Sequence, residues 1–158
     1  MKTFIEIFDA KFAEIHQTTC RLVEKIPSNK LYWQPLETNA LFPVISCGEY
    51  ILRSAAAVEQ TFGGITAKLW DDPFEWTLPE QLTNNQAVLK YLGEVEETRK
   101  KGFLFLTADE DLKKQIPAPE KLKTIFEILL ETIARAEHFQ GRAFAVFQLL
   151  SDEKLPKI

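Results

Sequence analysis

The sequence lacks the features that mark membrane-bound and exported chains. No segment reaches the ~18 uncharged apolar residues that a membrane-spanning helix requires. The apolar run at the N-terminus is interrupted by Glu6 and Asp9, unlike the continuous core of a signal peptide. Cysteine is scarce, and Cys20 and Cys47 lie on two different predicted helices, where they are interpreted as small buried side chains rather than a disulfide. We expect a cytoplasmic protein that has no membrane partner.

Glycine and proline are scarce, and a basic excess is missing. The 158 residues include only six glycines and eight prolines, so no low-complexity linker is visible, and we predict a single domain over residues 1–158. The formal net charge is −4, and Lys and Arg form no block. Because domains that bind DNA or RNA carry a basic face, nucleic acid is not expected as a partner.

Standard catalytic motifs are absent as well. The chain has no glycine-rich phosphate loop, Cys-x-x-Cys pair, His-Glu-x-x-His helix or Gly-x-Ser-x-Gly elbow. The acidic turn Asp109-Glu-Asp111 lacks the glycine and the terminal glutamate of an EF-hand loop, so it is interpreted as a helix boundary. Because these motifs are absent, the sequence predicts no cofactor and no catalytic residue.

What the sequence does contain is apolar residues at every third or fourth position, the spacing of a helix with one buried face. The first such helix runs from Phe4 to Ile26. The second is predicted from about Phe42, with Pro43 in its first turn, to Phe62, where Gly63-Gly64 provides the stop.

Two further helices are predicted after a proline-rich and aromatic connection. One begins near Thr83-Asn84, whose side chains can accept a free backbone N–H. The last runs from Pro119 to about Leu150 and places Ala136 and Phe139 on its apolar face. Since no segment alternates like a strand, the sequence predicts an all-α four-helix bundle.

Four motifs in this order resemble the DinB/YfiT-like family of bacterial four-helix-bundle proteins: Trp33-Gln-Pro35, Tyr50-Ile-Leu-Arg-Ser54, Asp111-Leu112 and Glu137-His-Phe-Gln-Gly141. The resemblance implies a DinB-like bundle with a long crossover connection and a tendency to form homodimers. In that family the last helix usually reads His-x-x-x-His, and these histidines join a third from the second helix to hold a divalent metal. Enzymatic members are metal-dependent thiol transferases and related hydrolases, while many others have no assigned activity.

At the three matched positions this chain has Tyr50, Arg135 and Phe139. A guanidinium stays protonated and has no lone pair to donate, and phenylalanine has no donor atom. Moving the second-helix position by one residue gives Glu49 and still no histidine. We therefore expect no metal.

Arg135 has two interpretations. It could pair with Glu59 or Glu49 inside the former metal cavity, because a buried guanidinium requires an acceptor. Alternatively, its stem lies on the core and its head reaches water.

The two histidines are candidates for a relocated metal site. His138 points about 100° away from Phe139 on the helical wheel, which favours a surface position. His16 lies one turn from Cys20, and a carboxylate such as Glu59 could complete a site; the alternative is a core-edge histidine bonded to a neighbouring helix.

Three functions remain open. We favour a non-catalytic bundle that binds a small molecule or a partner through a vestigial pocket, because the residues that the chemistry needs are replaced while those of the fold remain. One alternative is an enzyme: a thiol transferase or hydrolase with displaced metal ligands, or a metal-free hydrolase that uses His16, Cys20 or Tyr50. The other alternative is a structural homo-oligomer. The pocket candidates are Tyr50, Arg135, Phe139, Glu49, Glu59 and His16.

Overall fold

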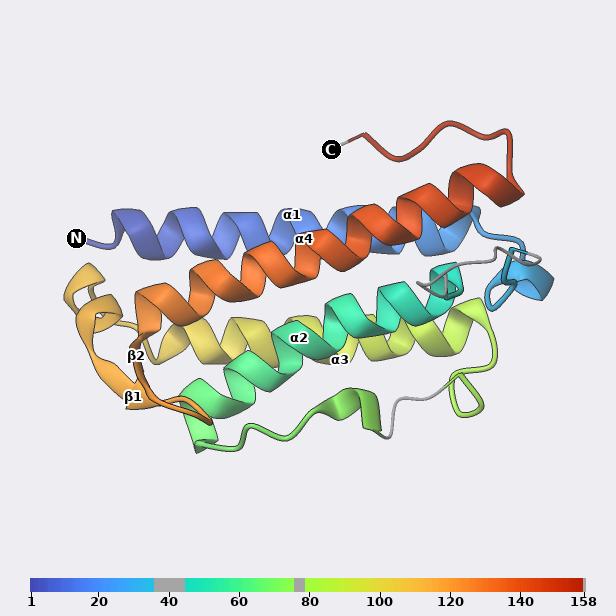
Figure 1. The fold of residues 1–158 in the computed structure, drawn as a ribbon. Coiled ribbons are helices and arrows are strands. Elements are labelled where there is room, and N and C mark those ends of the chain that lie inside the picture. Colours follow the sequence, from blue (N-terminus) through green and yellow to red (C-terminus); the bar gives the residue numbers. More distant parts are fainter. Residues whose placement is uncertain (36–44, 76–78, 158) are drawn as a thin grey trace.

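The computed structural model describes residues 1–35, 45–75 and 79–157, and four long helices make up most of this part of the chain (Figure 1). They are α1 (Thr3–Lys25), α2 (Cys47–Ala67), α3 (Asn85–Leu104) and α4 (Ile125–Leu150). Helices α1 and α4 run in one direction and α2 and α3 in the other, because the connection after α2 returns along the length of the bundle before α3 begins (Figure 1). The predicted all-α bundle with a long crossover connection is confirmed.

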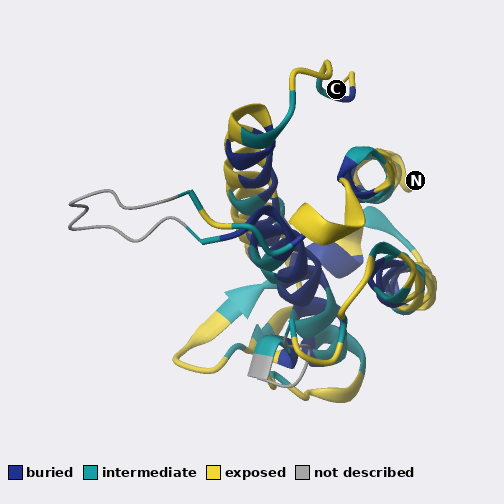
Figure 2. Cartoon of the chain, turned by 90° about the vertical axis from the view of Figure 1, so that its right-hand side faces the viewer, coloured by how far each residue is buried: buried dark blue, intermediate teal, exposed yellow. Residues whose placement is uncertain are grey.

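The apolar stripes of the four helices meet in one core. Helix α2 packs against α3 and α4, and α1 packs against the same two helices. The end-on view shows the buried faces turned toward one another (Figure 2). Phe12 and Phe62 are almost fully buried, and their ring centroids lie 5.4 Å apart, in the edge-on geometry that aromatic pairs favour.

Helices α2 and α4 begin with the same capping motif. The Ser46 hydroxyl accepts the N–H of Glu49 at 3.2 Å, and the Glu49 carboxylate accepts the N–H of Ser46 at 3.2 Å. Thr124 and Glu127 form the equivalent pair at 3.2 and 2.8 Å. The predicted starts at 42 and 119 were therefore wrong, and positions 42 and 43 lie outside the described residues. The Ser-x-x-Glu and Thr-x-x-Glu spacings were the signal for the true starts.

The predicted stop of α2 at Gly63-Gly64 was also wrong. The helix continues to Ala67 and ends at Lys68, whose left-handed backbone (φ 58°) lets the N–H of Leu69 reach the carbonyl of Gly63 at 3.2 Å. Gly64 lies under the indole of Trp70, which occupies the space that a Cβ would need. Glycine therefore serves close packing here instead of termination.

A small hairpin precedes α4, and its second strand lies where the sequence predicted helix. Strands β1 (Gln115–Pro117) and β2 (Leu122–Thr124) pair antiparallel, with Ile116 opposite Lys123. Strands of three residues are too short to show an alternating pattern. Three short 3₁₀ turns complete the described elements: η1 (Ser28–Lys30), η2 (Pro73–Glu75) and η3 (Asp109–Lys113).

The acidic turn η3 joins the N-terminus of α1. The carboxylate of Asp109 accepts the backbone N–H groups of Phe4 and Ile5, both at 3.1 Å. These N–H groups lie in the first turn of α1 and have no partner within the helix. The turn therefore caps a helix that is distant in the sequence, in addition to marking a boundary of its own.

Candidate functional site

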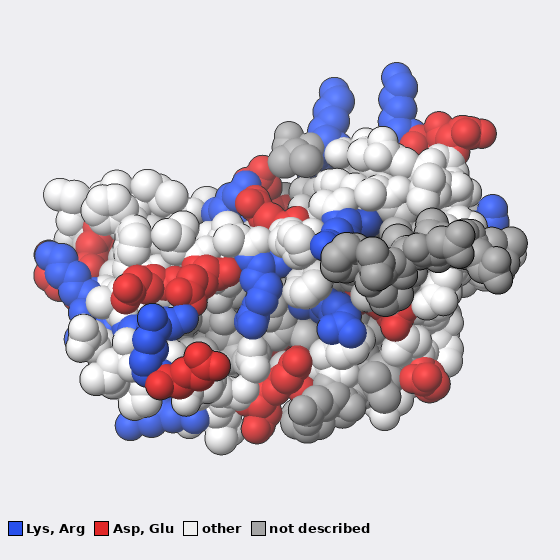
Figure 3. All heavy atoms as spheres, in the orientation of Figure 1, with Lys and Arg blue, Asp and Glu red and all other residues white. Residues whose placement is uncertain are grey.

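A pocket of about 140 Å³ opens between α2, α4 and the crossover connection. Arg53 and Gln60 of α2 and Arg135 and Phe139 of α4 form its sides, and Asp72 and Phe74 of the connection close it. Its floor is made by Ala56 and Ala57, which are buried and small enough to leave the space open. Acidic and basic side chains are interspersed over the face of the molecule formed by α2 and α4 (Figure 3).

Arg53 is only partly satisfied by the protein. Its guanidinium carbon lies 4.0 Å from the centre of the Phe74 ring, a distance typical of a cation–π contact. Its Nε is buried and has no hydrogen-bond partner among the described residues. A buried N–H without an acceptor costs free energy, so a ligand acceptor that reached this N–H would be favoured.

Arg135 extends across the same pocket toward α2. Its Nη2 donates to the side-chain oxygen of Gln60 at 3.1 Å and to the carbonyl of Ala57 at 3.4 Å. The side chain is exposed, as the interpretation with a solvated head predicted. The other interpretation, a pair with Glu59 or Glu49, was wrong.

Glu59 and Glu49 are engaged elsewhere. The carboxylate of Glu59 accepts the hydroxyl of Tyr91 on α3 at 2.8 Å. The carboxylate of Glu49 caps its own helix through Ser46. Neither carboxylate lines the pocket that contains Arg135.

Phe139 lies at the edge of this pocket, so its predicted place in the core was wrong: it is only half-buried. The next residue, Gln140, is 7% exposed, and its amide donates to the Ile15 carbonyl at 2.9 Å and to the Thr19 hydroxyl at 2.8 Å. These bonds between α4 and α1 turn Phe139 toward the bundle surface.

Tyr50 lies beside Phe139, with the two ring centroids 6.5 Å apart and nearly parallel. Its hydroxyl accepts a hydrogen bond from Arg142 at 3.4 Å. Tyr50 and Phe139 are therefore neighbours, while Arg135 is directed away toward Gln60.

These three positions do not offer a metal site. They contribute a phenol, a guanidinium and a phenyl ring, which is not a set of imidazole, thiolate or carboxylate ligands. Across the described ranges, no group of three His, Cys, Asp or Glu side chains could hold a metal ion.

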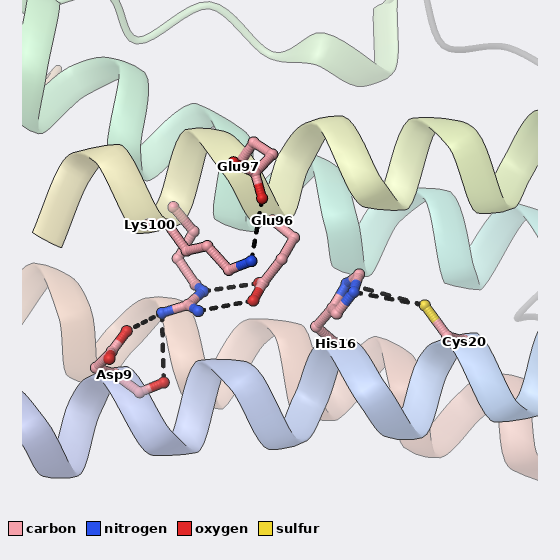
Figure 4. A network of polar contacts seen from close by, with 7 residues as sticks. Asp9, His16, Cys20, Glu96, Glu97 and Lys100 are labelled. Carbon is pink, nitrogen blue, oxygen red and sulfur yellow. Dashed lines mark hydrogen bonds and ion pairs between the residues drawn. The ribbon is translucent and has the colours of Figure 1, made fainter.

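His16 and Cys20 lie together on the face of α1 that is turned toward α3 (Figure 4). The Cys20 sulfur is 3.7 Å from Nε2 of His16. Burial raises the pKa of the Cys20 thiol to about 11, so the thiol is protonated near neutral pH and is a poor nucleophile. Burial also lowers the pKa of His16. Glu59, named as a carboxylate that could complete this group, instead accepts a hydrogen bond from Tyr91.

The carboxylate that interacts with His16 comes from α3 and belongs to a buried ion network. Glu96 and Arg99 are 8% and 3% exposed. Two charge-assisted bonds join them, from Nε to Oε2 at 2.8 Å and from Nη2 to Oε1 at 2.7 Å. Arg99 also donates to the Asp9 carboxylate on α1 (Figure 4). No signal in the sequence pointed to this network, since Glu-x-x-Arg spacing also occurs on solvated helix faces.

His138 is exposed, as predicted. The centroids of its ring and of the Phe139 ring lie 5.5 Å apart, in an edge-on arrangement.

None of the described helices is long and apolar enough to cross a membrane. Comparison of the chain with family models, with curated proteins and with solved structures finds no match.

Proposed function

We propose that this chain is a metal-free bundle that binds a small molecule, and that its ligand carries a carboxylate held between Arg53 and Arg135. The observation that carries the proposal is the guanidinium of Arg53, which lines the pocket while its buried Nε has no acceptor among the described residues. A carboxylate accepts two parallel hydrogen bonds from a guanidinium, which makes arginine the usual partner for such a group.

The charge around the pocket favours an anion. Two guanidinium groups, those of Arg53 and Arg135, face one carboxylate, that of Asp72. Asp72 is partly engaged, because one of its oxygens accepts the N–H of Phe74 at 3.0 Å. The pocket therefore has a net charge of one positive unit, which a single carboxylate would balance.

The shape of the pocket limits the size of the bound group. At about 140 Å³ it is smaller than the ~300 Å³ at which sites for drug-sized ligands begin. Phe74 and Phe139 provide apolar walls on two sides, which would strengthen hydrogen bonds inside by excluding water. A short carboxylic acid, or the carboxylate end of a longer one, fits this space.

Membership of the DinB/YfiT-like family is part of the same proposal, together with a bacterial origin, a cytoplasmic location and a homodimer. It is supported by the order of the four motifs and by the bundle with its long crossover connection. On this view the chain keeps the scaffold of the metal-binding members, while Tyr50, Arg135 and Phe139 replace the ligands.

The proposal is tested with propionate and its neutral analogue propionamide, followed by ¹H–¹⁵N NMR titration of the whole chain. Propionate is expected to shift the Nε–H signal of Arg53 and the backbone amides of Ala56 and Ala57, and propionamide is not. Arg53→Gln and Arg135→Gln should each weaken propionate binding by roughly tenfold or more, since hydrogen bonds to charged groups contribute about 1.5–3 kcal/mol.

The matched control is Arg142→Gln, which removes an arginine of α4 that does not line this pocket. Its affinity for propionate should equal that of the wild type. Equal binding of propionate and propionamide, or unchanged affinity in Arg53→Gln, would show that the pocket is not an anion site.

A further inference from the structure

A second and larger pocket adjoins the first one. It measures about 310 Å³ and lies between the end of α2, the hairpin and the first half of α4. Gln60 and Arg135 line both pockets, and the hydrogen bond between them, at 3.1 Å, forms part of the boundary that the pockets share. A ligand bound at Arg135 can therefore reach into either space.

One wall of the larger pocket is the aromatic ring of Trp70, whose position is fixed by three contacts. Its Nε1 donates to the carbonyl of Pro117 at 3.0 Å, and its own carbonyl accepts the side-chain amide of Gln60 at 2.8 Å. The ring also packs on Gly64, where any larger residue would displace it. This is a preorganised aromatic surface, which binds flat apolar groups with little loss of conformational entropy.

The remaining lining is apolar or already satisfied. Ala118, Pro119 and Ile128 contribute apolar surface. Lys123 and Glu131 neutralise each other through an ion pair of 2.5 Å. Arg135 is the exception: its Nη2 bonds Gln60 and Ala57, and its Nε and Nη1 have no partner among the described residues. The larger pocket therefore combines an aromatic wall and some apolar surface with one guanidinium at its edge that can bind an anion.

We infer that the two pockets form one site for an aryl-substituted carboxylic acid. Its carboxylate lies at Arg53 and Arg135, and its ring lies against Trp70 in the larger pocket. This inference rests on the proposed anion site and adds the class of ligand. A short flexible linker between ring and carboxylate is required, because the two groups occupy adjoining spaces that meet at Arg135.

The test compares 3-phenylpropionate with propionate, which share the carboxylate and differ in the ring. Burial of the phenyl ring against Trp70 should make 3-phenylpropionate bind roughly tenfold to a hundredfold more tightly in an NMR titration. Trp70→Ala should abolish this difference and leave the affinity for propionate within about twofold of the wild type.

Trp33→Ala is the matched control, because it removes the same side chain at the other end of the bundle, where Trp33 packs against the core. It should keep the preference for 3-phenylpropionate. If Trp70→Ala does not fold, an intermolecular nuclear Overhauser effect between the phenyl protons and the Trp70 indole in the wild type provides the same information.

The outcomes separate the two proposals. If neither acid binds, the anion site and the aryl site are both wrong. If both acids bind equally well, or if Trp70→Ala keeps the preference, the anion site stands and the aryl site is overturned. The wild type is also expected to show the Overhauser effect, and a bound phenyl ring without contact to Trp70 would overturn the aryl site.

Discussion

Replacing Arg99 by methionine should destabilise the fold strongly and in a manner that depends on pH. Arg99 is 3% exposed, and its guanidinium bonds both oxygens of Glu96, at 2.8 and 2.7 Å. Methionine fills a similar volume but leaves the buried Glu96 carboxylate without its cation. Removing one partner of a buried ion pair costs about 3–5 kcal/mol, so we expect a loss of that size in urea unfolding near pH 7.

The pH dependence follows from the protonation of Glu96. In the wild type, burial pushes the pKa of Glu96 upward, but the hydrogen bonds and charge of Arg99 outweigh it and hold the pKa below its usual value. A carboxyl group with a depressed folded pKa stabilises the protein above its unfolded pKa, and this contribution is lost as the pH falls through the folded pKa. In Arg99→Met the effect of burial is no longer opposed by the charge of Arg99, so the pKa of Glu96 should rise. Protonation of Glu96 at lower pH should then remove the cost of burying an unpaired carboxylate.

The difference in unfolding free energy between wild type and Arg99→Met should therefore be smaller near pH 5 than near pH 7. Lys100→Met is the control, since Lys100 pairs with Glu97 at 3.0 Å on the exposed side of the same helix. It should cost less than about 1 kcal/mol and show no comparable change with pH. A loss below about 1 kcal/mol for Arg99→Met, or an equal loss at both pH values, would refute the assignment of Glu96 as a buried charge held by Arg99.

Two further predictions concern packing. Gly102→Ala should destabilise the fold by about 1–3 kcal/mol, because the added Cβ would overlap the fully buried ring of Phe62. Gly93→Ala is the control: its Cβ would meet nothing within 4 Å, so it should stabilise the fold by about 0.5–1 kcal/mol. Equal effects of the two substitutions in thermal unfolding would contradict the close packing at Gly102. Phe139→Ala should lower the free energy of unfolding by about 1–2 kcal/mol, because the ring is only half-buried. Phe147→Ala, in the core, should lower it by about 3–5 kcal/mol. A larger loss for Phe139→Ala than for Phe147→Ala in urea unfolding would show that the Phe139 ring belongs to the core.

The helices themselves could be predicted because their signal is repeated many times. In α1 the residues Ile5, Phe8, Phe12 and Ile15 recur at helical spacing and are all buried, so the stripe does not depend on any one residue. The start of α3 was also predicted, and the Asn84 side chain accepts the N–H of Ala87 at 2.9 Å there. A cap residue next to a clear stripe is a local signal and can be recognised without tertiary information.

The errors at helix ends arose where two local signals disagreed. Gly63-Gly64 resembles a stop, but the glycines are needed for the approach of Trp70, which comes from the chain beyond the helix. At α4, the apolar pattern was extended back to Pro119 although Thr124 and Glu127 form a capping pair. Tertiary packing determines where α2 ends, and the capping pair is the local signal that marks the start of α4.

The candidate site could be predicted only in part because it depends on the rotation of α4 about its axis. Arg135 was identified from the family resemblance, and it lines the pocket. Arg53, which lies within the motif Tyr50-Ile-Leu-Arg-Ser54, was not identified as a pocket residue. Its neighbour Ser54 donates to the carbonyl of Ala136 at 2.8 Å, and this bond between α2 and α4 sets the register of the two helices.

That register explains why Arg53 and Arg135, which come from two different helices, line one pocket. Gln140 bonds α1 from the core face of α4, so Phe139 and Arg135, one turn apart, are directed to the groove beside α2. Arg53 reaches the same groove because Ser54, the next residue, is bonded to α4. A helical pattern shows which residues share a face but not which side-chain bonds fix that face against its neighbours. The convergence of Arg53 and Arg135 therefore follows from two buried hydrogen bonds, those of Ser54 and Gln140, whose partners lie on other helices.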